Sequence, residues 1–218
     1  MFVLIWVYTI YNNVGVGVNS LSSSQTVFNS VGVSKLSSSP NYFYFAYGSN
    51  MCSETMKSLR KLNPISSKPA VLDNYQLKFD IPGMPLIEPS WASVEECKES
   101  KVHGVLYELT PDEFASVCRT EGVPFSYTLK RCQVRSYSKY YTETEQSAFT
   151  LIKSPLLPRN KLPSPPSQSY LNVLIRGAEE FDLDDEYIKK LKNIAPNKAI
   201  IGNGIAENML RMARFSNS

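Results

Sequence analysis

Histidine and closely spaced cysteines are scarce in this sequence. His103 is the single histidine among 218 residues, and no Cys-x-x-Cys pair occurs among Cys52, Cys97, Cys118 and Cys132. Zinc sites built from His and Cys need closely spaced ligands, and disulfide frameworks occur in chains much richer in cysteine. We therefore expect neither a metal site nor a disulfide scaffold, and the cysteine usage favours a reducing compartment.

Neither sign of charge dominates, and no basic block occurs along the chain. Lys and Arg number 23 against 20 Asp and Glu, which gives a formal net charge of +3. Nucleic-acid-binding domains generally cluster their basic side chains, so we expect no nucleic-acid partner. Charged residues make up 20% of the chain and hydrophobic residues 43%, which excludes wholesale disorder and a polytopic membrane protein. The length suits one compact domain, or one domain with a tail.

Acidic residues are missing from the first 53 positions, where Lys35 is the single basic residue. Residues 2–11 form an apolar run too short to span a bilayer as a helix, so we expect no stable membrane span. A secretory signal peptide would need a positively charged N-terminal region, and a transit peptide would need more arginine; these residues have neither. A targeting segment, a disordered extension and an incorrectly assigned start all stay open for residues 1–40. We assign residues 41–198 to the folded domain and 199–218 to a C-terminal tail. The cytoplasm is the expected location, unless residues 1–40 direct the chain to an organelle or to secretion.

The folded domain is predicted to begin with a strand, a tight loop and a helix. Residues 41–47 are rich in aromatics, as buried strands often are, and the run ends at Gly48. Apolar residues then recur at every third position from Met56 to Leu62, with Ser53 placed to cap the helix. Pro64 ends this element.

The middle of the chain reads mostly as strands. Extended segments are predicted at 70–79, 91–94 and 102–109, with a Pro/Gly loop at 82–89 between the first two. Residues 110–113, Thr-Pro-Asp-Glu, form a capping box that opens a short helix. That helix should end near Arg119, which puts Glu121 and Gly122 at the corner where the chain reverses.

Further strands at 127–134 and 148–152 precede a proline-rich loop at 153–166. Ser167 is placed to cap a following helix, and residues 183–194 have the pattern of a second one. Strands in the middle and helices at the end predict an α+β domain with a mixed, mostly antiparallel, barrel-like sheet and flanking helices.

Three segments together resemble the γ-glutamylcyclotransferase family. Residues 44–51, Tyr-Phe-Ala-Tyr-Gly-Ser-Asn-Met, are similar to the family's substrate loop between its first strand and first helix. Residues 102–109 and the later Glu121-Gly122-Val123, with Tyr127 six residues after the glutamate, resemble the segment that carries the family's catalytic glutamate. Residues 166–191 look like its C-terminal helical region.

The resemblance implies a γ-glutamylcyclotransferase-like fold and an enzyme that uses neither a metal nor an organic cofactor. The implied reaction converts a small γ-glutamyl amino acid or amine into 5-oxoproline and the free amine. The implied catalytic residue is Glu121, and the implied substrate-binding residues are Tyr47, Gly48, Ser49, Asn50 and Tyr127. The oligomeric state stays open, a homodimer included.

These residue types suit the chemistry, because such a substrate carries its own nucleophile. Its α-amine can attack the γ-carbonyl, and one carboxylate that accepts a proton and returns it serves both halves of the reaction. Glu121 is the candidate for this acid/base. Gly48 lets the backbone approach a ligand, and nearby N–H groups can hold an anion or a polarised carbonyl. We expect Tyr127 to orient the carboxylate or the substrate.

Other functions stay open. A related cyclotransferase could act on γ-glutamylamines, glutathione or a specialised conjugate, although Gly-Ser-Asn, in place of the Gly-Ser-Leu typical of glutathione-specific relatives, leans away from glutathione. A non-catalytic small-molecule binder could share the fold, since an isolated helix-end glutamate is usually solvated. A Glu121 carboxylate remote from the Gly48 loop would favour the binder.

Overall fold

The computed structural model describes residues 40–84, 87–138, 141–157 and 164–197. The predictions for the N-terminal extension and the C-terminal tail lie outside these residues, apart from Pro40. Within the described residues, no helix has the length and apolar character needed to cross a bilayer.

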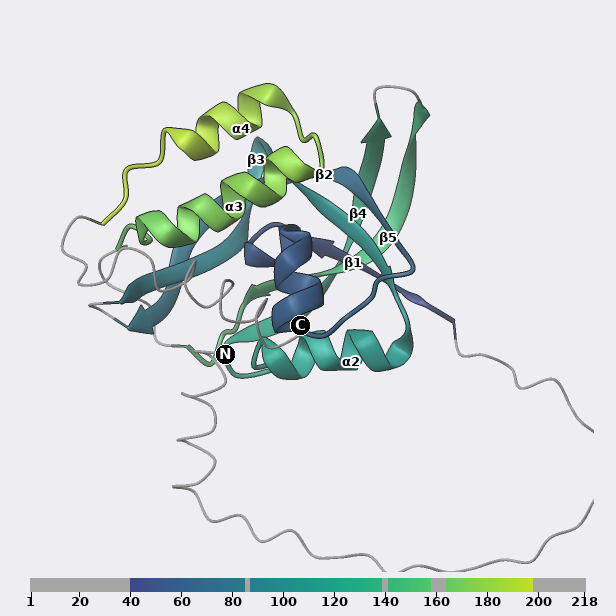
Figure 1. Cartoon of the computed structure of the whole chain (residues 1–218), viewed down its shortest axis with the longest axis horizontal. Coiled ribbons are helices and arrows are strands. Elements are labelled where there is room, and N and C mark those ends of the chain that lie inside the picture. Colours follow the sequence, from purple (N-terminus) through teal and green to yellow (C-terminus); the bar gives the residue numbers. More distant parts are fainter. Residues whose placement is uncertain (1–39, 85–86, 139–140, 158–163, 198–218) are drawn as a thin grey trace, which may run out of the picture.

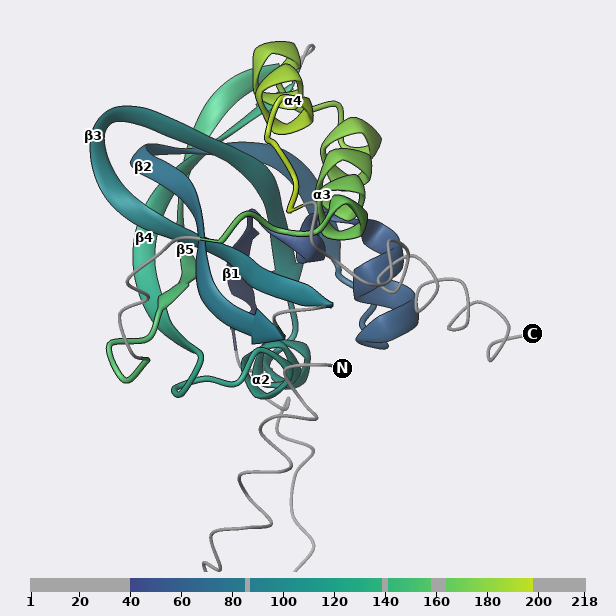
Figure 2. The same cartoon turned by 90° about the vertical axis from the view of Figure 1, so that its left-hand side faces the viewer.

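Five strands form a barrel, with two helices along one side and a third across one end (Figure 1 and Figure 2). The elements, in chain order, are β1 (Tyr42–Ala46), the 3-10 helix η1 (Ser49–Met51), the π-helix η2 (Thr55–Leu59), β2 (Ser66–Met84), β3 (Glu88–Leu109), α2 (Pro111–Thr120), β4 (Tyr127–Ser138), β5 (Tyr141–Lys153), α3 (Gln168–Glu180) and α4 (Asp185–Lys192).

The barrel closes in the order β1-β3-β2-β4-β5. β1 runs parallel to β5, where Tyr44 lies opposite Phe149, and the other neighbouring strands are antiparallel. The predicted mixed, mostly antiparallel barrel is confirmed. β1 is central to it, because it pairs on both sides and its last three residues are buried.

β2 and β3 are longer than predicted, and together they form one extended hairpin. The segment 82–89, expected to be a Pro/Gly loop, is mostly strand: Pro82 pairs with Ser90 and Met84 with Glu88. Residues 95–101, expected to separate two strands, are part of β3. Register shifts after Asp73 and after Phe79 let so long a hairpin bend around the barrel.

The helix predicted to begin at Ser53 is only partly confirmed. The regular part is the π-helix η2, and its N-cap position is Glu54, with no side-chain cap. Met56 and Leu62 are buried as expected, but Leu59 is exposed. The wider π-turn changes which side chains share a face, so the three-residue spacing did not predict correctly which of them are buried.

α2 begins at the predicted capping box. The hydroxyl of Thr110 accepts a hydrogen bond from the N–H of Glu113, and the Glu113 carboxylate accepts one from the N–H of Thr110. The helix ends at Thr120, one residue beyond the expected end, and Gly122 follows with φ of 71°. Glu121 is therefore fixed at the helix end, where the chain turns toward β4.

α3 and α4 match the two predicted C-terminal helices. Ser167 caps α3 by accepting a hydrogen bond from the N–H of Tyr170, as predicted. α3 packs against η1, so that the substrate loop predicted from the sequence lies between the barrel and this helix (Figure 2).

Candidate active site

The predicted site residues come together around one cavity at the junction of β1, α3 and the end of α2. Its walls are Tyr44, Tyr47, Gly48, Ser49, Asn50, Glu121, Tyr127, Leu151 and Tyr170. All six residues singled out from the sequence are in this set, although they lie up to 80 positions apart in the chain. The structure thus shows that they share one place; their roles remain predictions.

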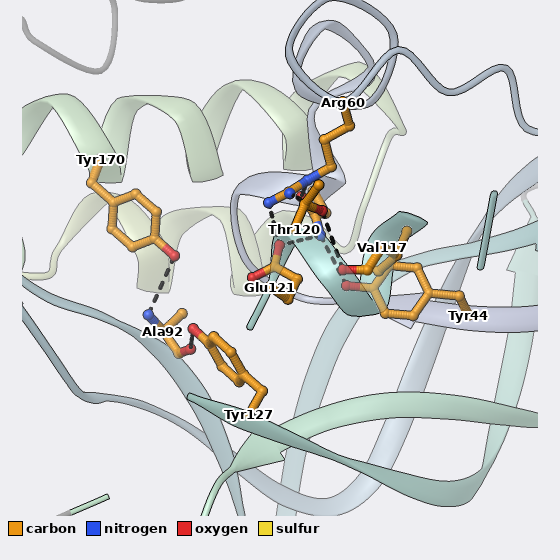
Figure 3. A network of polar contacts seen from close by, with 9 residues as sticks. Tyr44, Arg60, Ala92, Val117, Thr120, Glu121, Tyr127 and Tyr170 are labelled. Carbon is orange, nitrogen blue, oxygen red and sulfur yellow. Dashed lines mark hydrogen bonds and ion pairs between the residues drawn. The ribbon is translucent and has the colours of Figure 1, made fainter. Parts of the chain in front are cut away.

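Glu121 is 8% exposed, and one of its two carboxylate oxygens is held by two neighbours. Oε1 is in an ion pair with Arg60 and accepts a hydrogen bond of 2.9 Å from Asn50 Nδ2. Oε2 has no hydrogen-bond partner in the described part of the chain, and Figure 3 shows it on the side of the carboxylate that faces Ala92 and Tyr170. The carboxylate is anchored through one oxygen and leaves the other for a ligand.

Arg60 is the residue that sequence reasoning missed. Its Nε donates to Asn50 Oδ1 at 2.5 Å, its Nη1 donates to Thr120 Oγ1 at 2.6 Å, and its Nη2 meets Glu121 (Figure 3). A basic residue near the end of a predicted helix normally faces solvent, and no motif distinguished this one. Only the fold brings its guanidinium beside Glu121.

Gly48 and Asn50 lie on a short turn that is held by its own backbone hydrogen bonds and packs against Tyr170 of α3. The N–H groups of Met51 and Cys52 close the turn on Gly48 and Ser49 at 2.9 and 3.1 Å. The N–H groups of Gly48 and Asn50 have no acceptor among the residues that the structure describes. A Cβ atom at Gly48 would lie only 3.2 Å from the Tyr170 hydroxyl, so glycine lets the backbone lie close to this wall of the cavity.

Four buried phenols complete the walls. The Tyr44 hydroxyl accepts a hydrogen bond from Asn50 Nδ2 at 3.0 Å, and the Tyr47 hydroxyl donates one to the Leu151 carbonyl at 2.5 Å. The other two hydroxyls bond to the backbone of Ala92: Tyr127 donates to its carbonyl, and Tyr170 accepts from its N–H. Burial raises the pKa of all four phenols above their usual value, so they stay protonated at neutral pH.

Tyr127 does not hold the carboxylate, contrary to one of the two roles expected for it. Its hydroxyl donates to the Ala92 carbonyl at 2.8 Å, whereas Arg60 and Asn50 hold Glu121. Tyr127 instead fixes β3 against β4 at the cavity wall, and contact with a substrate remains a prediction.

A larger cavity, about 500 Å³, lies between β2, β3, β4 and β5, away from these residues. Its walls carry both charges, and Asp73 and Arg135 on them already pair through two hydrogen bonds of 2.7 and 3.0 Å. Among the described residues, no three His, Cys, Asp or Glu side chains gather as metal ligands in either cavity or elsewhere. The smaller cavity around Glu121 is the better candidate for chemistry, because an anchored acid and the Gly48 turn both line it.

Comparison with known proteins finds a family model, relatives named as γ-glutamylcyclotransferases and a solved structure that resemble this chain. Residues 101–191 match the model of the AIG2-like family. The bovine γ-glutamylcyclotransferase is 30% identical over 172 residues, which cover 72% of this chain and 80% of the relative. The γ-glutamyl cyclotransferase aclK of Aspergillus oryzae is 26% identical over 171 residues, which cover 71% of this chain but only 61% of the relative's length. A solved γ-glutamyl cyclotransferase structure superimposes with a TM-score of 0.64 at 24% identity, covering 79% of this chain and 99% of the other.

Proposed function

Because this chain belongs to the γ-glutamylcyclotransferase family of enzymes, we propose that it converts γ-glutamyl amino acids or amines into 5-oxoproline and the free amine. One observation carries the proposal: the Glu121 carboxylate and the Gly48 turn line the same cavity, and Oε2 of the acid faces Ala92 and Tyr170 rather than Arg60. This arrangement argues against a non-catalytic binder, for which an acid remote from the turn was expected.

The reaction needs no nucleophile from the protein. The substrate's α-amine attacks its own γ-carbonyl carbon and closes a five-membered ring, and the bond from that carbon to the departing amine then breaks. Well-oriented intramolecular reactions reach effective molarities of ~10⁵ M or more, so the protein's main tasks are to fold the substrate and to move protons.

Glu121 would carry the protons. Its free Oε2 takes a proton from the attacking amine as the ring closes, and the same oxygen returns the proton to the departing amine. A positioned general acid/base is typically worth ~10²–10⁴ in rate. The proton balance closes with one carboxylate, which is ionised again at the end of each turnover.

The Gly48 turn would stabilise the charge that develops on the γ-carbonyl oxygen. The N–H groups of Gly48 and Asn50 have no acceptor in the described chain, and both residues line the cavity, so these groups are the donors we assign to the oxyanion. The protonated phenols of Tyr47 and Tyr127 are donors already engaged with backbone carbonyls, which keeps the opposite wall rigid.

The proposal is tested by incubating the full chain with γ-glutamyl amino acids, γ-glutamyl-ε-lysine and glutathione and measuring 5-oxoproline. We expect release from at least one γ-glutamyl amino acid, and the ranking of the panel identifies the departing amine. Absence of 5-oxoproline from every member, with a protein shown to be folded, would contradict the proposal.

A further inference from the structure

Arg60 connects two segments that the proposed reaction needs in fixed relative positions, the Gly48 turn and the end of α2. Its guanidinium reaches Asn50 on the Gly48 turn, Thr120 at the end of α2, and Glu121. The side chain is 12% exposed and does not line the cavity itself. It lies behind the acid, on the side away from the ligand space.

The guanidinium also fixes which way the Asn50 amide points. Arginine has only donors, so Asn50 must present its carbonyl oxygen to Nε of Arg60. The amide nitrogen is then directed to Glu121 Oε1 at 2.9 Å and to the Tyr44 hydroxyl at 3.0 Å. Arg60 and the acceptor-only carboxylate of Glu121 therefore select the same orientation of the amide, and Arg60 holds both residues at once.

A π-helix brings Arg60 to this position. The N–H of Arg60 bonds to the carbonyl of Thr55, five residues earlier, at 3.0 Å, and the N–H of Leu62 bonds to the carbonyl of Met56. The extra residue in the turn leaves Leu59 exposed and directs Arg60 inward. π-turns are rare and are often found at functional sites, which fits a device that places one side chain.

We propose that Arg60 is the positioning residue of the catalytic acid: it holds Oε1, leaves Oε2 facing the substrate, and ties the acid to the Gly48 turn. This inference rests on the proposed function. The planar guanidinium meets three acceptors at once, whereas a lysine ammonium at this distance would act as a single point charge.

The experiment compares steady-state kinetics of the wild type with those of Arg60→Met and Arg60→Lys, on the best substrate of the panel. We expect kcat to fall by about 100-fold in both variants, since a misplacement of about 1 Å can cost that much. KM should stay close to the wild-type value, because Arg60 does not line the cavity. Guanidinium ions added to Arg60→Ala should restore part of kcat, and methylammonium should not.

Arg131→Met is the matched control, because the Arg131 side chain is exposed on β4 and does not line the cavity. It should leave kcat unchanged. If the Arg60 variants fail to fold, Thr120→Val decides: it removes one acceptor of the guanidinium and should lower kcat at unchanged KM.

Two results would overturn the inference. One is a folded Arg60→Met, or in its place Thr120→Val, with wild-type kcat. The other is a parallel loss of kcat, substrate affinity and melting temperature without rescue by guanidinium, which would indicate a merely structural residue. A wild type that is inactive on the whole panel would instead contradict the proposed function.

Discussion

Replacing Gly177 with alanine should displace the turn that carries Gly48 and Asn50, because α3 packs directly against that turn. A Cβ atom at position 177 would lie 2.6 Å from the backbone nitrogen of Cys52 and 2.8 Å from two atoms of Met51. Ordinary contacts of a Cβ atom begin at 3.4 Å. Helix α3 and the turn would have to move apart by the difference, which is 0.8 Å at the closest contact. The atoms in contact include backbone atoms of the turn, which cannot rotate away as the tip of a side chain could.

Two opposing effects set the magnitude. Alanine is favoured over glycine in a helix by about 0.5–1 kcal/mol. Overpacking of a buried contact costs typically 1–3 kcal/mol. The cost of overpacking is the larger of the two, so we expect the free energy of unfolding of Gly177→Ala to fall by about 1–2 kcal/mol. A shift of this size in the turn should also lower kcat by at least about tenfold, since catalytic geometry is sensitive to ~1 Å.

Denaturant unfolding and 5-oxoproline kinetics test both parts. Glu179→Ala serves as the control, because it changes an exposed position of the same helix and should alter neither quantity by much. A Gly177→Ala variant that is as stable as the wild type or more so, with unchanged kcat, would show that α3 does not set the position of the turn.

Two further changes probe the walls of the cavity and the start of α3. Tyr127→Phe leaves the buried carbonyl of Ala92 without its phenol donor, so the free energy of unfolding should fall by about 1–3 kcal/mol, measured by urea denaturation; an unchanged value would refute this account of the phenol. Burial raises the pKa of the Glu88 carboxyl to about 7 from an ordinary 4.5, although hydrogen bonds from Ser167 oppose the shift. Because the folded-state pKa is the higher one, the stability that Glu88 contributes is complete below about pH 4.5 and is lost as pH rises through about 7, an effect of roughly 3 kcal/mol. Glu88→Gln should flatten melting temperature against pH in this window, and a slope equal to that of the wild type would contradict the assignment.

The sequence identified those parts of the fold that local chemistry determines. The capping box at Thr110 and the cap at Ser167 each join residues three positions apart, so both were visible without the structure. The corner at Gly122 was visible for the same reason, because its positive φ favours glycine. Glu121 was located as a consequence of these local signals together with a family resemblance.

The missed features depend on contacts between distant residues. The partner of the Tyr127 hydroxyl is Ala92, 35 positions earlier, and the partner of Glu121 is Arg60, 61 positions earlier. The π-turn that directs Arg60 inward has the same apolar residues as a regular helix, so periodicity could not distinguish the two. The long β2–β3 hairpin was broken up in the prediction because Pro82 and Gly83 are residue types common in loops, whereas in the structure the ladder continues through Pro82, paired with Ser90, to Met84, paired with Glu88.

The most direct test of the account is the turnover of Glu121→Gln on the best γ-glutamyl substrate of the wild type. Glutamine is nearly the same shape and can still meet Arg60, but it cannot accept and return a proton. Asp112→Asn, at an exposed position at the other end of the same helix, is the matched control and should keep wild-type kinetics. We expect 5-oxoproline formation by Glu121→Gln to fall by ~10²–10⁴ while the fold is retained. A folded Glu121→Gln that turns over at the wild-type rate would contradict the central claim that this carboxylate moves the protons.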